Sequence, residues 1–258
     1  IAEIKRADVR ELLDGIEGDV LPNRVLTIVK TLFRYALSRD WIEASPVEGI
    51  AKPMAESPRE RVLDMGEIAR VWNAAGLLGY PSGLFVRLLI LTAQRRSEVA
   101  GMQWAGLNLD DATWTLQSAD TKASRAHLVP LSAPAVAIVK AAPEIGPFVF
   151  TTDGETHIHN FAKTKQLLDS FIAAKGEPLP AWTLHDLRRS AATHMVRLGV
   201  SMEVVGRVLN HAPTGVTRTT YALHEYAPEK RGALDRWAAG VVRAVEGKPS
   251  GKVVRLRG

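Results

Sequence analysis

Six residues scattered over half of the chain have side chains suited to one reaction, the attack of a tyrosine on a phosphodiester. Five of them carry or can gain a positive charge, and the sixth is a phenol. They are Arg95, Lys122, His185, Arg188, His211 and Tyr221. The negative oxygens of a phosphodiester repel nucleophiles, and its alkoxide leaves poorly. An enzyme working without a metal therefore needs fixed cations, an acid and a nucleophile held in line.

Each residue type suits one of these tasks. The planar arginine fork matches two phosphate oxygens and keeps its charge. A lysine beside other cations can lose its proton more easily, so Lys122 suits protonation of the leaving oxygen. A free phenol has a pKa near ~10. Neighbouring cations must therefore favour the phenolate of Tyr221, or His185 must accept its proton.

The segments that position the first two cations have clear patterns. Residues 83–93 are apolar except for Arg87, which predicts a buried helix leading to Arg95. Glu98 follows three residues later and is placed to brace Arg95. Residues 113–117 and 126–131 alternate like two strands, and the connection between them, residues 118–125, holds Lys122.

The histidines and the second arginine belong to the C-terminal half. Thr183, with Asp186 three residues on, predicts the start of a helix that runs to Leu198 and stops at Gly199. His185 and Arg188 lie three residues apart on its first turn and face the same way, where the helix N-terminus favours an anion. The sequence also predicts a shorter helix over 202–209, before His211, and a helical turn over 216–222 that presents Tyr221.

The remaining elements are mostly helical. Two early helices are expected, and in the second the apolar positions include Ile28 and Leu32. Asp64 and Glu67 form the pattern of a capping box. The predicted helices are 7–17, 22–39, 65–75, 133–141, 157–174 and 228–244, with a short strand at 148–150. The expected fold class is mainly α with a small antiparallel β-sheet.

Composition sets further bounds. The chain has 258 residues, of which 46% are hydrophobic and 24% charged, as in an ordinary globular protein. It has no cysteine, which fits a reducing cytoplasm. No signal peptide or apolar run of ~18 residues is found, so no membrane role is expected. The net charge is +5, and most of it lies in residues 241–258. Because the chain begins at Ile1 without a methionine, we expect a fragment of a longer protein.

The segments around the six residues resemble the tyrosine recombinase (phage integrase) family. Leu91-Thr-Ala-Gln-Arg-Arg-Ser-Glu-Val99 is similar to the family pattern Thr-Gly-x-Arg-x-x-Glu, with the small residue Ala93 where glycine is usual. Thr183-Leu-His-Asp-Leu-Arg188 resembles the His-x-x-Arg box. Leu209-Asn-His211 resembles Leu-Gly-His, and Arg218-Thr-Thr-Tyr-Ala-Leu-His224 resembles the Thr-x-x-Tyr-Ala-x-His segment that carries the nucleophile.

The remaining cation, Lys122, also fits the resemblance, since Thr121-Lys122 and the following Val129-Pro-Leu131 are similar to the family's catalytic hairpin. The resemblance implies that Arg95 and Arg188 clamp the phosphate, His211 bonds a phosphate oxygen, Lys122 protonates the leaving 5′ oxygen and Tyr221 attacks. We assign the nearby Tyr226 to packing or solvent, Arg96 to a structural role, and Arg189 to a structural or DNA-facing one.

The resemblance further implies an organisation and partners. Residues 1–55 would be part of a helical core-binding domain, 56–62 a linker, 63–245 the catalytic domain and 246–258 a basic tail. The protein would cut and rejoin double-stranded DNA at attachment sites as a homotetramer in a bacterial cytoplasm, associated with the nucleoid. The reaction would proceed through a 3′-phosphotyrosyl link without metal, cofactor or ATP. Accessory DNA-bending or directionality proteins are possible partners.

Three other interpretations stay open at this stage. A type IB topoisomerase uses similar chemistry on one duplex, and a DNA-binding regulator can use the same fold without catalysis. An RNA-binding or scaffolding role has only the basic tail in its favour. A zinc site that includes His157 and His159 does not match known ligand spacings.

Overall fold

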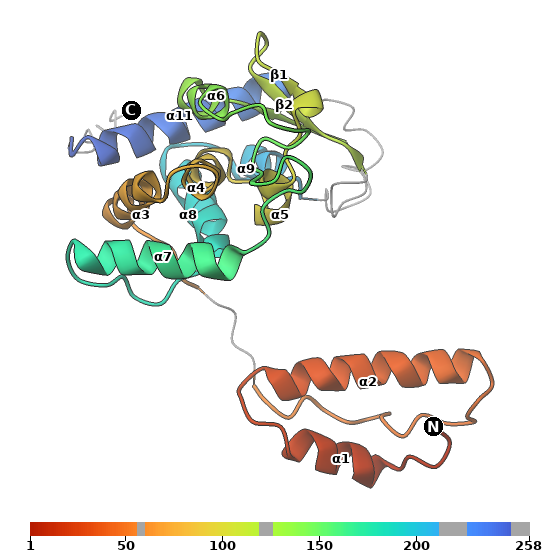
Figure 1. Cartoon of the computed structure of the whole chain (residues 1–258). Coiled ribbons are helices and arrows are strands. Elements are labelled where there is room, and N and C mark those ends of the chain that lie inside the picture. Colours follow the sequence, from red (N-terminus) through yellow and green to blue (C-terminus); the bar gives the residue numbers. More distant parts are fainter. Residues whose placement is uncertain (56–59, 119–125, 212–225, 249–258) are drawn as a thin grey trace, which may run out of the picture. The chain divides into compact units, whose positions relative to one another are not determined.

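The chain divides into two compact units, residues Ile1–Glu60 and Arg61–Gly258. The computed structural model describes residues 1–55, 60–118, 126–211 and 226–248 (Figure 1). Among these residues, none of the helices combines the length and apolar character that crossing a membrane requires.

The first unit is a helix pair with a small core. Helix α1 spans Arg6–Asp14 and α2 spans Leu21–Ser38. The buried core consists of Val9, Leu13, Leu26, Phe33, Val47 and Ile50. Both predicted helices are confirmed, but not every apolar position in α2 is buried. Ile28 is 68% exposed and Leu32 49%, because α2 packs on α1 and the chain after it with its opposite face.

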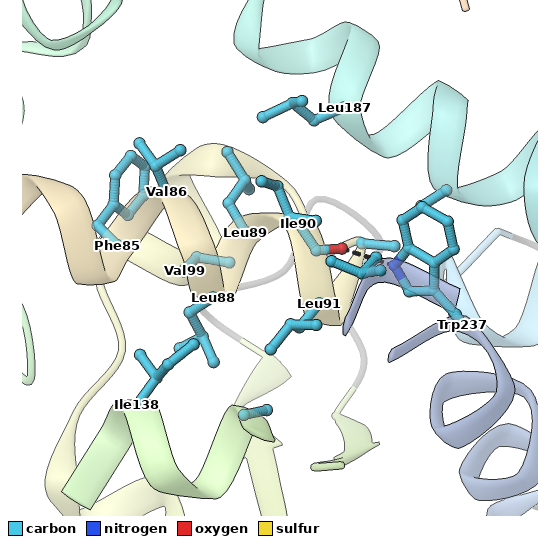
Figure 2. Packing of buried hydrophobic residues seen from close by; sticks show 14 of the residues in the cluster. Phe85, Val86, Leu88, Leu89, Ile90, Leu91, Val99, Ile138, Leu187 and Trp237 are labelled. Atoms are coloured by element: carbon cyan, nitrogen blue, oxygen red, sulfur yellow. Dashed lines mark hydrogen bonds between the residues drawn. The ribbon is translucent and has the colours of Figure 1, made fainter. Parts of the chain in front are cut away.

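The second unit is built around one buried helix, α4 (Ser82–Thr92). Besides the short helix that follows it in the chain, four longer helices pack on α4, so it has no polar face, as expected for a helix surrounded by protein. They are α3 (Met65–Leu78), α6 (Ala133–Lys140), α8 (Leu184–Arg197) and α11 (Ala227–Val245). Figure 2 shows Ile138 of α6 and Leu187 of α8 on opposite sides of the α4 side chains. The predicted buried helix is confirmed.

Trp237 ties the last helix to this centre. The fully buried indole Nε1 donates a hydrogen bond to the Ile90 carbonyl at 2.8 Å (Figure 2). The face of the indole stacks on the ring of His194 in α8, with ring centroids 5.8 Å apart. The indole therefore joins α4, α8 and α11 at one point.

A three-stranded antiparallel sheet lies beside the helices, in the order β1-β2-β3. The strands are β1 (Leu107–Asn108), β2 (Thr113–Leu116) and β3 (His127–Pro130). The two predicted strands are confirmed, and Trp114 pairs with Val129. The short β1 was not predicted, because two residues give no readable alternation.

Two predictions between β3 and α8 need correction. Residues 148–150 form no strand: Phe148 makes a single bridge with Gln103, and the Val149 N–H donates to the Met102 carbonyl at 2.8 Å. The helix predicted over 157–174 is α7, Phe161–Ala174. It begins later because the Asn160 side chain caps it, accepting from the Lys163 N–H at 3.2 Å.

Predicted helix starts are confirmed by their caps. At α3, the Glu67 N–H donates to Asp64 at 2.8 Å and the Asp64 N–H donates to Glu67 at 2.9 Å. At α8, Asp186 accepts from the N–H of Thr183 at 2.8 Å and from its hydroxyl at 3.0 Å. These bonds satisfy backbone donors that a helix start otherwise leaves unpaired.

Replacing Trp237 by alanine is expected to lower the free energy of unfolding of the second unit by about 3–5 kcal/mol, the usual cost of a large cavity. Calorimetric unfolding measures this. In the control, Leu77→Ala, half of the side chain is already exposed, and the change should stay within about 0.5 kcal/mol. Similar losses in both variants would contradict the central role of Trp237.

Candidate active site

Arg188 lies on the first turns of α8 and is only 5% exposed. One guanidinium nitrogen, Nη1, donates to the Ala93 carbonyl at 2.8 Å, and the other, Nη2, donates to the Leu209 carbonyl. The side chain thus connects the segment before Arg95 with the segment before His211. Burial, followed by the positive charge of Arg95, lowers the pKa of Arg188 to about 10.

Arg95 precedes the short helix α5 (Arg96–Ala100) and is braced twice by one carboxylate. Its N–H donates to Glu98 Oε2 at 2.9 Å, and its Nη1 lies 2.7 Å from Glu98 Oε1. The carboxylate is buried, whereas the Arg95 side chain is 24% exposed. The expected brace is confirmed, and the guanidinium it holds remains accessible.

Ala93 explains how the chain turns between α4 and Arg95. It has φ 54° and ψ 20°, in the left-handed region, and its N–H closes the helix on Leu89. A residue with a Cβ is strained there by roughly 1–2 kcal/mol. This position therefore requires a left-handed backbone as well as a small side chain. Glycine adopts that backbone without strain, which is a physical reason for the glycine in Thr-Gly-x-Arg-x-x-Glu.

His185 and His211 share an electrostatic environment. Partial burial, followed by the charge of Arg188, lowers the pKa of each below the ordinary value of 6.5, and Arg95 contributes in the same direction. The pKa of His185 is further lowered by Arg189 and raised by Asp186. Four of the six predicted site residues therefore lie close enough to affect one another.

The C-terminal end of helix α9 (Met202–Val208) presents His211. Asn210 adopts a left-handed conformation with φ 49°, and the His211 N–H donates back to Gly206 at 2.9 Å. The Val208 carbonyl lies 2.9 Å from Gln94 Nε2 and 3.2 Å from His127 Nε2.

Gln94 and His127 were not predicted as site residues. Gln94 is a polar residue directly after an apolar run, and His127 is a polar residue in a short apolar strand. A polar residue in an apolar segment is visible in the sequence and could have marked each of them. The sequence does not indicate that both side chains contact the Val208 carbonyl.

Lys122 and Tyr221 lie outside the described residues. The described neighbours of the Tyr221 segment are His211 and Tyr226, and both contact α9. The Tyr226 hydroxyl donates to Glu203 at 2.9 Å, and the Arg207 guanidinium lies 4.6 Å from the Tyr226 ring centroid. The bond to Glu203, then burial, raises the pKa of the Tyr226 phenol, so this hydroxyl is a poor source of phenolate.

The arginines next to the two clamp candidates have other contacts. The Arg96 guanidinium lies 5.0 Å from the Phe161 ring centroid. Arg189 Nη1 lies 3.3 Å from Asp186 Oδ1. Among the residues that the structure describes, no group of three or more histidines or carboxylates is arranged to hold a metal ion.

The arrangement concentrates positive charge. The charges of Arg95 and Arg188 lower the pKa of both imidazoles, and the charge of Arg95 lowers that of Arg188. Among the described residues, the hydrogen bonds of Arg188 to the Ala93 and Leu209 carbonyls engage two of its five N–H groups. A bound anion would relieve this repulsion. A phosphate or another oxyanion suits this arrangement, because an arginine can donate to two of its oxygens at once.

Comparison with known proteins gives the class. The model of the phage integrase family matches residues 61–227. This is more than half of the chain, so the chain belongs to the phage integrase family.

Individual relatives agree with the family match. Tyrosine recombinase XerD of Caulobacter vibrioides is 27% identical over 205 residues, covering 74% of this chain and 66% of the relative. Prophage integrase IntZ of Escherichia coli K12 is 33% identical over 148 residues, covering 54% and 36%. A putative integrase/recombinase of Haemophilus influenzae is another relative. The chain spans 66% of the length of XerD and 63% of the length of the Haemophilus protein.

Solved structures support the fold. A lambda integrase tetramer bound to a Holliday junction has a TM-score of 0.65 at 17% identity, covering 83% of this chain and 66% of that one. XerH bound to its difH substrate has a TM-score of 0.60 at 15% identity, covering 89% and 70%. The mainly helical fold with a small antiparallel sheet is confirmed.

Replacing Arg188 by glutamine should raise the pKa of both His185 and His211, because its charge acts on each. Two-dimensional NMR titration of the histidine rings measures this. Arg189→Gln is the matched control and should raise only the pKa of His185. Unchanged values for His211 in a folded Arg188→Gln protein would contradict the described site.

The lowered pKa values of His185 and His211 predict how the free energy of unfolding depends on pH. Folding lowers the pKa of both histidines, so the unfolded chain binds protons more readily. Their contribution to stability should therefore fall as the pH drops below about 6.5. Denaturant unfolding between pH 8 and pH 5 tests this, and Arg188→Gln should flatten the dependence.

Proposed function

We propose that this chain is a site-specific DNA recombinase that cuts and rejoins DNA strands through a 3′-phosphotyrosyl intermediate, without metal or ATP. One observation carries the proposal: Arg188 donates to the Ala93 carbonyl at 2.8 Å, two residues before Arg95, so that two arginines from distant segments share one site. Arg95 is held by a buried carboxylate and Arg188 by two carbonyls. Such fixed donors stabilise a charged transition state, because they need no reorganisation during the reaction.

These contacts support the roles proposed for the described residues, and the roles proposed for Tyr221 and Lys122 rest on the family resemblance of their segments. Arg95 and Arg188 bind the non-bridging oxygens of the scissile phosphate, and His211 donates to one of them. His185 accepts the phenol proton of Tyr221, which fits its lowered pKa, because a neutral imidazole is a base at pH 7. Lys122 protonates the leaving oxygen.

The chemical step balances without an outside reactant. The Tyr221 oxygen forms a bond to phosphorus as the bond to the 5′ oxygen breaks, and Lys122 supplies the proton of the new 5′ hydroxyl. A 5′ hydroxyl from a partner strand then attacks the phosphotyrosyl link and releases Tyr221. One phosphodiester replaces another, so no ATP is needed.

Chain connectivity supports the assignment of the nucleophile. Tyr221 precedes Tyr226 by five residues, which span at most about 18 Å when fully extended. Tyr226 is held on α9 by Glu203 and Arg207, and α9 also presents His211. The covalent chain therefore keeps Tyr221 within about 18 Å of Tyr226, which contacts the helix that presents His211.

The proposed partners are double-stranded DNA and further copies of the chain. The first unit would be part of a core-binding domain and the second the catalytic domain, with residues 56–62 as the linker and 246–258 as the basic tail. Related structures are described as an integrase tetramer on a Holliday junction and an integrase dimer on a core site. For this chain we propose a homotetramer on DNA in a bacterial cytoplasm, aided by DNA-bending or directionality proteins.

Trapping the covalent intermediate tests the function. The chain is incubated with a pool of nicked duplexes of randomised sequence, in which the released fragment diffuses away, and adducts are resolved on a denaturing gel. The wild type should form an adduct and Tyr221→Phe none, with unchanged DNA binding. Tyr226→Phe is the matched control and should keep the adduct. No wild-type adduct, or an adduct with Tyr221→Phe, would overturn the proposal.

The same assay tests the proposed clamp. Arg95→Gln should slow adduct formation by roughly 10²–10³-fold, the usual effect of removing one donor to a developing charge. Arg96→Gln, which removes the neighbouring charge that lies over Phe161, should change the rate by less than about tenfold. Equal losses would indicate a general loss of DNA affinity.

A further inference from the structure

The carbonyls at the C-terminal end of α9 are buried and receive donors from three distant segments. A helix leaves its last four carbonyls without partners inside the helix. Here the Leu209 carbonyl accepts from Arg188, and the Val208 carbonyl lies within hydrogen-bond distance of Gln94 and His127. Side chains from these segments therefore fix the backbone that leads to His211.

We propose that Gln94 and His127 are positioning residues that hold His211 beside Arg95 and Arg188 by bonding the Val208 carbonyl together. The role assigned to this positioning, a correctly placed phosphate donor, rests on the proposed recombinase function. The geometric part of the proposal does not.

Gln94 links the two halves of the site directly. It is 1% exposed, precedes Arg95 in the chain, and its Nε2 donates to the carbonyls of Thr92 and Val208, both at 2.9 Å. Within the described residues its Oε1 is buried without a hydrogen-bond partner. An apolar side chain would avoid that desolvation cost. The bond across to α9 gives a physical reason for an amide here.

His127 approaches the same carbonyl from the sheet. It is 7% exposed, and its Nε2 lies 3.2 Å from Val208 O. A carbonyl only accepts hydrogen bonds, so Nε2 carries the proton. Its strand is itself fixed, because Lys230 of α11 donates to the adjacent Leu128 carbonyl at 2.7 Å. His127 is thus a donor on a rigid support.

Two donors on one carbonyl suit positioning better than stability alone. Val208 precedes His211 by three residues, and the intervening Asn210 is already in a left-handed conformation. A shift of this carbonyl moves the imidazole relative to both guanidinium groups. A displacement of about 1 Å at a reacting group can cost roughly 10²-fold in rate.

An NMR titration tests the geometry without requiring any activity. The variants are Gln94→Met and His127→Phe, alone and combined, which remove each donor and keep its bulk. His127→Gln restores a donor near the position of Nε2. In the combined variant the pKa of His211 should rise toward 6.5 as it moves away from Arg188 and Arg95, and His127→Gln alone should leave it near the wild-type value.

The matched control is His194→Phe. His194 is also 7% exposed and also bonds one carbonyl through Nε2, that of Leu63 at 2.8 Å. It should lower the unfolding temperature by an amount similar to His127→Phe while leaving the pKa of His211 unchanged. If the combined variant folds and keeps the wild-type pKa, or if His194→Phe shifts it equally, the positioning proposal is overturned.

The covalent-adduct assay adds the functional arm. Gln94→Met with His127→Phe should slow single-turnover adduct formation by about 10- to 100-fold, while the DNA concentration for half-maximal rate changes less than about twofold. His194→Phe should keep the wild-type rate. A wild type that forms no adduct would overturn the recombinase function, while the titration would still decide the geometry. A rate loss caused only by weaker DNA binding would count against positioning.

Discussion

The buried end of helix α9 is the constraint on which the candidate site depends. Its last carbonyls point into protein, where an unpaired acceptor is costly. Arg188 satisfies one of them and the carbonyl before Arg95 at the same time. The Arg188 guanidinium therefore satisfies two buried carbonyls and also places a positive charge in the site. Arg188 keeps its positive charge after both bonds form. The contacts that hold Arg188 therefore also favour the binding of an anion beside it.

Repulsion between the positive charges of the site disfavours folding, and interactions elsewhere in the second unit offset it. Arg95 lowers the pKa of Arg188, both arginines lower the pKa of the two imidazoles, and the carboxylate of Glu98 partly opposes the effect on Arg188. Such an arrangement is unfavourable for an empty protein and favourable for one that binds phosphate. The compensating stability comes from the large hydrophobic core around α4 and from the indole that joins three helices. Binding and folding here oppose each other, as is common at functional sites.

Sequence patterns predicted those features that are local. The apolar run of α4, the Asp64 and Asp186 caps and the Arg95 brace all involve residues within a few positions of each other, so periodicity and spacing reveal them. Contacts between distant segments were not predictable in this way. Nothing near Gln94 or His127 specifies that both reach Val208. Likewise, the exposure of Ile28 depends on which face of α2 packs, and the apolar pattern alone does not decide it.

Both described ends flanking residues 212–225 rest on α9: the His211 N–H returns to Gly206, and Tyr226 contacts Glu203 and Arg207. Both anchors lie on one short helix, so the points at which the chain enters and leaves residues 212–225 move with α9. A substitution that shifted α9 would therefore shift both anchors at once, whatever the sequence between them.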